Sequence, residues 1–370
     1  MGRRGLIGLG CALALWLGAG SALAQIRIGQ TVGMSGAVAA TSGEARQGAL
    51  LWFEAVNKAG GINGQAIELV TLDDRFEVDR AVDNARQLIK QGVLALFLNR
   101  GTPHTQALMP LLSEARIPLV APSTGAMVLH QPVHPWVFNV RAPYQREAER
   151  AITHLTQIGV TRIALVQVDD AFGDDAVQGA LGALKAAGLQ AVAHQRYARA
   201  KPDFTAVIPA IVKAEPQAVL YVGSGTAVVD GMKALRQAGS RAQLITLSNN
   251  ASAGFLQQLG EHARGLIVSQ VFPSERSIAT PLVKDAQALA RAKQLELSPA
   301  MIEGFAAARV LTEALRKAGR NPTREGLQAA LNGLRNVDLG GLELSFSPQD
   351  HTGLAYVDLA IVGEDGHFRR

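Results

Sequence analysis

Residues 29–74 read GQTVGMSGAVAATSGEARQGALLWFEAVNKAGGINGQAIELVTLDD and contain the unit that the rest of the chain repeats. A short apolar strand leads into a loop of Gly, Ser, Ala and Thr, and apolar residues then recur at helical spacing over residues 44–58. Gly60 and Gly61 supply the left-handed residue that ends a helix, and a second apolar strand covers residues 67–72. A strand, a helix and a strand in this order predict neighbouring parallel strands, with the small-residue loop at their carboxyl edge.

The start of the chain has a different composition from the rest. Two arginines precede an apolar run over residues 6–17, and an Ala-Leu-Ala site ends at residue 24. These features are typical of a secretory signal peptide, so we predict that residues 1–24 are removed and that the mature protein lies outside the cytoplasm. The alternative, a membrane anchor, would need a span of ~20 apolar residues.

The chain contains a single cysteine, Cys11, which lies inside that apolar run. The mature protein is therefore expected to have no disulfide and to depend on its core alone. Cys11 as a lipid attachment site would require a cut through the middle of the run.

At 370 residues, 48% of them hydrophobic, the chain is long enough for two cores.

Several function classes find no support in the composition and motifs. The formal charge is only +5 and the basic residues are scattered, so we predict no nucleic-acid partner. Gly223-Ser224-Gly225 follows a predicted strand, but Val228 stands where a dinucleotide fingerprint needs its third glycine. The eight histidines are dispersed, which argues against a metal site. We predict a protein that is not an enzyme and that binds no cofactor.

Alternation of strands and helices continues after the opening unit and predicts an α/β fold with two doubly wound, parallel-sheet lobes. Prolines cluster over residues 130–143, where we expect the chain to cross between the lobes. Residues 281–331 contain helices with no strand between them, so this segment is expected to return to the first lobe. The predicted end is hairpin-like, over residues 342–346 and 354–362. The predicted boundaries are 25–141 plus 272–345 for lobe 1, and 142–271 plus 346–370 for lobe 2.

Five loops at the carboxyl ends of predicted strands consist of Ser, Thr, Gly and Asn, and most of them begin a helix. Ligands bind at this edge of an open parallel sheet. Exposed backbone N–H groups and helix N-termini there suit an anion, each contact contributing roughly 0.3–1 kcal/mol, so we expect a carboxylate-bearing ligand. The alternative is that Thr102, Ser123 and Ser224 only cap their own helices. The loops cover residues 33–41, 100–102, 123–125, 224–226 and 248–250.

The chain resembles the extracellular solute-binding proteins of branched-chain amino acid ABC transporters, of the leucine/isoleucine/valine-binding type. The resemblance lies in GMSGAVAATSGEARQGALLWFEAVNKAGGINGQAIELVTLDD, RGTP, PLVAPSTGA, VFNVRAPYQRE, RIALVQVDDAFGDD and GGLELSFSP, and it spans essentially the whole mature chain. It implies a type I periplasmic binding fold with a hinge of three chain crossings and a ligand trapped by closure of the lobes. It further implies a periplasmic monomer that delivers its solute to a membrane ABC permease. A sensory protein of the same fold, which passes its ligand state to a membrane receptor, is the alternative.

By motif position, the resemblance implies that Thr102 and the backbone around Gly101 hold a ligand carboxylate. Ser123, Thr124 and Gly125 would hold the main polar group of the ligand from the same lobe. Gly125 stands where these proteins often carry a hydroxyl, so one contact is expected to be lost.

The second lobe would contribute Phe172, which closes over the ligand, together with Thr226 and Ser248. Phe172 stands where the family often has Tyr, so a second contact is expected to be lost. Ser248 falls roughly where the amino acid binders carry an acid for the ligand's ammonium group. Without such an acid, a buried ammonium group would lack a charge partner, at a cost of several kcal/mol.

The sequence leaves several explanations open for the missing acid. Asp170 or Glu303 could replace it, or the ligand is a carboxylate without an amine, an amide or an aromatic acid. Asp170 also fits a turn residue, and Glu303 also fits a solvent-facing helix position. Arg100 suits bidentate recognition of a second carboxylate, and a surface arginine is the alternative.

Overall fold

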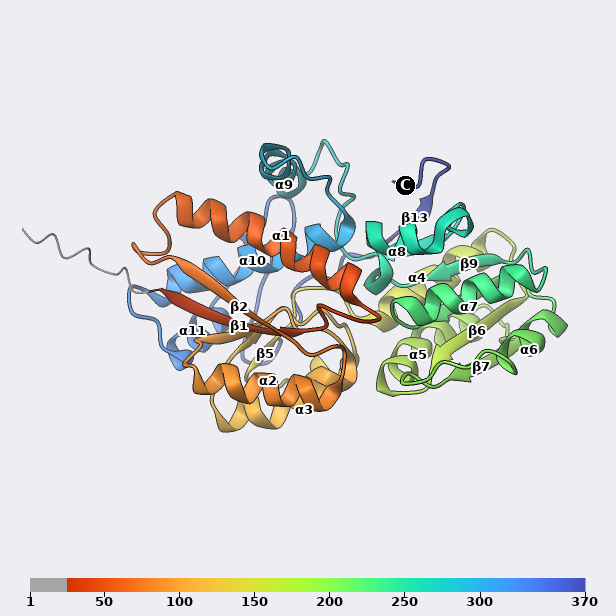
Figure 1. Ribbon diagram of the computed structural model, residues 1–370, viewed down its shortest axis with the longest axis horizontal. Helices are drawn as coiled ribbons and strands as arrows, with labels where there is room; N and C mark the ends of the chain where they lie inside the picture. Colours follow the sequence, from red (N-terminus) through yellow and green to blue (C-terminus); the bar gives the residue numbers. More distant parts are fainter. Residues whose placement is uncertain (1–24, 370) are drawn as a thin grey trace, which may run out of the picture.

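A computed structural model describes residues 25–369, and the predicted signal peptide at residues 1–24 lies outside them (Figure 1). The described chain forms two lobes that lie side by side, each built on a mostly parallel sheet with helices around it (Figure 1). The predicted α/β class is confirmed. Within residues 25–369, no helix combines the length and apolar character that a membrane crossing requires.

The first sheet is entirely parallel and has the strand order β2-β1-β3-β4-β5. Its strands alternate with helices along the chain, as the opening unit predicts. The elements are β1 (Ile26–Val32), α1 (Ala39–Lys58), β2 (Ile67–Asp73), α2 (Val78–Lys90), β3 (Ala95–Phe97), α3 (Thr102–Glu114), β4 (Leu119–Val120), the 3-10 helix η1 (Met127–Leu129) and β5 (Val137–Phe138).

The second sheet has seven strands in the order β14-β13-β10-β9-β8-β6-β7, of which β13 and β14 run antiparallel to their neighbours. Its elements are α4 (Tyr144–Gln157), β6 (Ile163–Val168), α5 (Ala171–Ala186), β7 (Ala193–Tyr197), α6 (Val207–Lys213), β8 (Ala218–Val222), α7 (Thr226–Gln237), β9 (Gln243–Thr246), η2 (Ser248–Asn250), α8 (Ala253–Leu259), η3 (Gly260–Ala263), β10 (Ile267–Gln270), β13 (Asp358–Val362) and β14 (Phe368–Arg369).

The chain passes between the two sheets more than once. It leaves the first sheet after β5, leaves the second after β10, and then forms α9 (Pro281–Ala292), α10 (Pro299–Ala318) and α11 (Arg324–Asn332) beside the first sheet (Figure 1). Phe346 and Leu354 pack in the first core, whereas Ala360 packs in the second. We therefore propose that the third crossing lies between Leu354 and β13, later than the predicted boundary at residue 345.

Two local expectations differ from the structure. The hairpin expected from residues 342–346 and 354–362 is wrong, because β12 (Glu343–Leu344) pairs with β11 (Val337–Asp338) while β13 adds to the second sheet. Helix α2 was not expected between residues 72 and 93. Its buried face consists of two alanines and a leucine, which is a weak apolar signal.

Helices α1 and α10 pack closely in the first lobe, and two glycines allow this approach. A Cβ at Gly48 would lie 1.9 Å from the carbonyl oxygen of Met301, and one at Gly304 would lie 1.8 Å from that of Ala45. Both distances are far below van der Waals contact. The contact orients α10, which carries Glu303 into the region between the lobes.

This packing predicts that Gly48→Ala lowers the free energy of unfolding by about 1–3 kcal/mol, because the added methyl group forces the two helices apart. Gly43→Ala is a matched control on the same helix, since a Cβ there meets no atom within 4 Å. The control should leave stability unchanged or raise it by up to about 1 kcal/mol, as expected for Gly→Ala in a helix. Urea unfolding measures both, and equal stabilities of the two variants would contradict the packing argument.

Candidate functional site

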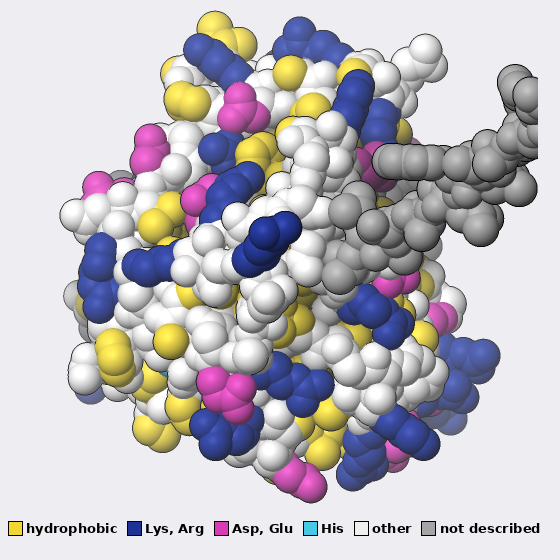
Figure 2. Space-filling view, turned by 90° about the vertical axis from the view of Figure 1, so that its left-hand side faces the viewer, with side chains coloured by type: hydrophobic (Ala, Val, Ile, Leu, Met, Phe, Trp, Pro, Cys, Tyr) yellow, Lys and Arg dark blue, Asp and Glu magenta, His cyan; other side chains and the backbone are white. Residues whose placement is uncertain are grey.

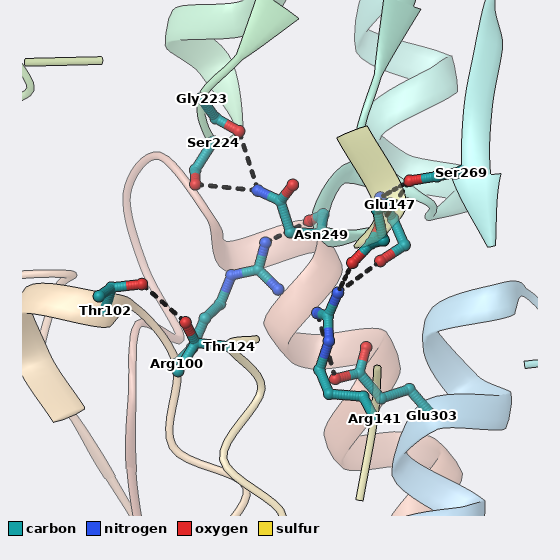
Figure 3. Close-up of polar contacts among 11 residues, drawn as sticks. Arg100, Thr102, Thr124, Arg141, Glu147, Gly223, Ser224, Asn249, Ser269 and Glu303 are labelled. Atoms are coloured by element: carbon teal, nitrogen blue, oxygen red, sulfur yellow. Dashed lines mark hydrogen bonds and ion pairs between the residues drawn. The ribbon is translucent and has the colours of Figure 1, made fainter. Parts of the chain in front are cut away.

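The loops after β3 and β4 lie together at the carboxyl edge of the first sheet. Arg100 and Ser123 form a parallel bridge that extends the pairing of the two strands, and the Ser123 N–H donates to the Asn99 carbonyl at 2.7 Å. Beyond the bridge, the hydroxyls of Thr102 and Thr124 hydrogen-bond to each other at 2.7 Å (Figure 3). The structure therefore brings the first-lobe residues of the predicted site together.

The hydroxyl residues of these loops do not cap helices, so the capping alternative is wrong. Gly101 and Gly225 occupy the N-cap positions of α3 and α7, without a side-chain hydrogen bond to either helix start. After Ser123 the chain forms only the short η1, whose N-cap is Ala126. The Ser123 hydroxyl is buried without a hydrogen-bond partner. The α-helix expected after Gly125 is also wrong.

Gly125 and Gly225 occupy positions where two backbone segments meet. A Cβ at Gly125 would lie 2.6 Å from the Ala142 carbonyl oxygen, where the chain first crosses between the lobes. Gly225 has a positive φ of 58°, and a Cβ there would lie 1.8 Å from the Ala37 carbonyl oxygen. The hydroxyl missing at Gly125 is therefore explained by the close approach of the crossing.

The two lobes touch through the predicted loops. The Thr226 N–H donates to the Ala37 carbonyl at 3.1 Å, so the start of α7 meets the small-residue loop after β1. Glu44 on α1 accepts hydrogen bonds from the backbone N–H groups of Ala253 and Gly254 at 3.0 and 2.8 Å. These contacts hold the carboxyl edges of the two sheets against each other.

Arg100 reaches across this boundary from the first lobe to the second. Its guanidinium donates to the backbone carbonyl of Asn249 and is only 3% exposed (Figure 3). Burial lowers the pKa of Arg100, and Tyr144 and Glu303 only partly offset this effect. Among residues 25–369 no carboxylate lies within ion-pair distance of Arg100, and its Nε is buried without a partner. The surface-arginine alternative is therefore wrong.

Arg141 is the second buried cation at the boundary, and it has partners on several elements. It forms an ion pair with Glu147 of α4 and donates to the Ser248 hydroxyl at 2.7 Å. Its guanidinium also lies 4.5 Å from the ring centroid of Tyr144. Burial alone would lower the pKa of Arg141, but its interactions with Tyr144, Glu147 and Glu303 outweigh this effect and hold the pKa above its usual value.

Ser248 and Glu303 contact different nitrogens of the Arg141 guanidinium, Nη2 and Nη1 respectively. The Ser248 backbone N–H donates to Glu147 at 2.9 Å, so this residue belongs to the Arg141 network. Glu303 lies 3.8 Å from Arg141 and is mostly buried, so its solvent-facing alternative is wrong (Figure 3). Arg141 is closer to Glu147 than to Glu303. The Glu303 carboxylate faces the boundary from the first lobe.

Asp170 and Phe172 are both occupied within the second lobe. The Asp170 side chain caps α5 by accepting from the backbone N–H groups of Phe172 and Gly173, and it forms an ion pair with Arg199. The turn-residue reading of Asp170 therefore describes its contacts. The Phe172 ring packs against Tyr144 at a centroid distance of 4.6 Å, in the second core.

Arg141, Glu147 and Asn249 were not among the predicted site residues. Arg141 directly follows an apolar strand-like stretch, and a charge at such a position needs a partner, which was the available signal. Glu147 lies six residues later across a proline, a spacing that matches no helical pairing. Asn249 takes part through its backbone carbonyl, which side-chain type does not predict.

Among the described residues, the outer end of the first lobe, on the left in Figure 1, shows no patch in which side chains of one charge gather. Basic side chains are scattered there among acidic and apolar ones (Figure 2). Buried charged side chains instead gather between the lobes, where Figure 3 shows Arg100, Arg141, Glu147 and Glu303.

Comparison with known proteins gives consistent matches. A family model described as periplasmic binding protein matches residues 25–367. The chain is 23% identical to Leu/Ile/Val-binding protein homolog 3 of Brucella melitensis biotype 1 over 330 residues, 89% of each chain. A crystal structure of a substrate-binding periplasmic protein from Ralstonia solanacearum is 34% identical, with a TM-score of 0.86, and the match covers 93% of this chain and 99% of that one. A possible leucine/isoleucine/valine-binding protein from Rhodopirellula baltica SH 1 is 27% identical, with a TM-score of 0.84 and coverage of 94% and 96%.

The Arg141 network predicts that Glu147→Gln lowers the free energy of unfolding by about 3 kcal/mol or more, because it leaves a buried cation without its closest acid. Glu149→Gln, two residues further along α4 and exposed, is the control and should change stability by less than about 0.5 kcal/mol. Urea unfolding of the two variants measures the difference. If Glu147→Gln is as stable as the control, Arg141 does not depend on this ion pair.

Proposed function

Since the chain belongs to the periplasmic binding protein family, we propose that it is the solute-binding component of an ABC uptake transporter. It captures a small carboxylate-bearing solute, an amino acid or a related amide or organic acid, between its lobes in the periplasm. It then delivers this solute, chemically unchanged, to a membrane permease. The printed names of relatives as Leu/Ile/Val-binding proteins support an amino acid or a compound close to one.

Arg100 is the single observation that carries the carboxylate assignment. It is a buried cation at the boundary between the lobes, without a carboxylate of the described chain against it and with an unpartnered Nε. A ligand carboxylate removes the cost of this uncompensated charge and accepts hydrogen bonds from the guanidinium. The backbone of Ser123 pairs with that of Arg100, and its unpartnered hydroxyl supplies a further donor.

The acids of the boundary bear on whether the solute carries an ammonium group. Asp170 is occupied by the start of α5 and by Arg199, so we propose that Glu303 is the partner of an ammonium group. Arg100 and Glu303 are then two opposite charges with weak protein partners, and an amino acid zwitterion complements both. In this arrangement the carboxylate lies toward Arg100 and the ammonium group toward Glu303.

A thermal-shift screen of amino acids, amides, dicarboxylates, aromatic acids, sugars and simple cations tests the proposal. We expect stabilisation by carboxylates, because ligand that binds the folded state alone raises its stability. Chromatography of the incubated hit should recover it unchanged. Shifts with sugars or cations alone would overturn the carboxylate assignment, and conversion of the hit would overturn the binding-only role.

We predict that Arg100→Met raises the Kd of the best carboxylate hit at least about 30-fold, as expected for the loss of about 2 kcal/mol at a buried charged contact. Arg100→Lys should lie between Arg100→Met and the unmodified protein, because it keeps the charge and loses the planar fork. Arg116→Met, at an arginine with a 66% exposed side chain after α3, is the control. Isothermal calorimetry measures all three, and unchanged affinity in Arg100→Met would refute the role of Arg100.

Glu303→Gln tests the ammonium assignment with a matched pair of probes, L-leucine and 4-methylpentanoate, which lacks the amine. We expect about a tenfold or greater loss of L-leucine affinity and little change for 4-methylpentanoate, because only the amine uses the lost charge. Equal losses for both probes would show that Glu303 acts on the fold of the site instead. A protein that binds 4-methylpentanoate more tightly than L-leucine would contradict an ammonium site.

A further inference from the structure

Phe76 lies in the turn between β2 and α2 with an unusual backbone. Arg75 and Phe76 both have positive φ angles, 53° and 60°, which non-glycine residues rarely adopt. The side chain of Asp73 accepts from the Arg75 N–H, and that of Asp74 accepts from the Phe76 N–H, each at 2.8 Å. A backbone with positive φ at two consecutive non-glycine residues is strained, and contacts outside the turn must hold it in place.

The turn directs the Phe76 ring onto His104 of α3. The two rings are stacked, with centroids 4.5 Å apart and planes 14° from parallel. A Cβ at Gly101 would lie 2.5 Å from the His104 ring and 3.0 Å from that of Phe76. The pair therefore supports the back of the Gly101 loop, next to Arg100 and Thr102. Burial, together with the nearby charge of Arg199, lowers the pKa of His104 to about 4, so the imidazole is neutral at pH 7.

The other lobe supplies the third member of this stack. The Arg199 guanidinium, from the loop after β7, lies 5.1 Å from the Phe76 ring centroid. Asp170 holds it there through an ion pair, and the two side chains are only 20% and 17% exposed. A partly desolvated cation over an aromatic face is attracted more strongly than an exposed one.

We propose that Arg199 is a positioning residue that clamps the closed lobes by binding the face of Phe76. The contact joins the Asp170 cap of α5 in lobe 2 to the Phe76–His104 support of the Gly101 loop in lobe 1. It exists only while the lobes are together, so it slows their separation. This inference rests on the lobe closure of the proposed function, and it concerns residues outside the proposed solute contacts.

Arg199→Met is the central variant, because methionine keeps an unbranched apolar stem and removes the cation. Arg196→Met is its matched control, three residues earlier, since Arg196 pairs with Asp169 and Asp174 of its own lobe. Phe76→Leu removes the aromatic face from the other side. Urea unfolding first establishes that each variant is folded.

Single-molecule energy transfer reports the lifetime of the closed form without any added solute. Residues 25–370 contain no cysteine, so dyes can be attached at Lys90→Cys on α2 and Gln178→Cys on α5, both exposed positions. We expect Arg199→Met and Phe76→Leu each to shorten the closed dwell about fivefold, and Arg196→Met to leave it unchanged. The double variant should match the single ones, because both remove the same contact.

Several outcomes would overturn the clamp. The clamp would be refuted if the closed form of Arg199→Met lasted as long as that of Arg196→Met. It would also be refuted if the double variant shortened the closed lifetime by the product of the two single effects. A complete absence of closed excursions in the unmodified protein would also contradict it, because the clamp would then not hold the lobes. The measurement involves no solute, so a failed carboxylate screen would leave its result intact.

Discussion

The buried charge of Arg141 is the constraint on which the region between the lobes depends. It lies where the chain first leaves the first sheet, and its partners come from α4, from the loop after β9 and from α10. A cation that is 1% exposed is tolerated only when acids and hydroxyls surround it. The same network therefore neutralises the charge and joins segments that are far apart in the sequence.

Arg100 and Arg141 illustrate two uses of the same side chain in one structure. Arg141 has an acid in direct contact that balances its charge, although its Nε and Nη1 are buried without a hydrogen-bond partner. Arg100 donates to the backbone carbonyl of Asn249, and no carboxylate of residues 25–369 lies within ion-pair distance of it. A buried charge satisfied internally organises the fold, whereas one left for an external partner suits recognition, because its cost is removed only when that partner binds. We therefore propose a structural role for Arg141 and a recognition role for Arg100.

Local patterns in the sequence were sufficient for the α/β class and for placing the predicted loops at the carboxyl edge of a sheet. Helical periodicity and the crossover rule placed the Ser, Thr and Gly loops at one sheet edge, and the structure has Arg100 bridged to Ser123 there. The capping alternative failed because Gly101 and Gly225, not the hydroxyl residues, precede α3 and α7. The predicted hairpin of residues 342–346 and 354–362 failed because β13 pairs with β10, roughly ninety residues earlier along the chain, and a local pattern does not specify such a partner.

Contacts between the lobes could not be predicted, since they join residues with no sequence relationship. Arg199 and Phe76 are an example, because nothing in either segment indicates the other. We propose that Arg100 and Arg199, which each contact the other lobe, have opposite effects on closure. Closure buries the unpaired charge of Arg100, which opposes it, while the contact of Arg199 with Phe76 favours it. A solute shifts such an equilibrium only by its differential affinity for the closed form. We propose that a carboxylate on Arg100 supplies that difference, because it converts the cost of burying this charge into an attraction.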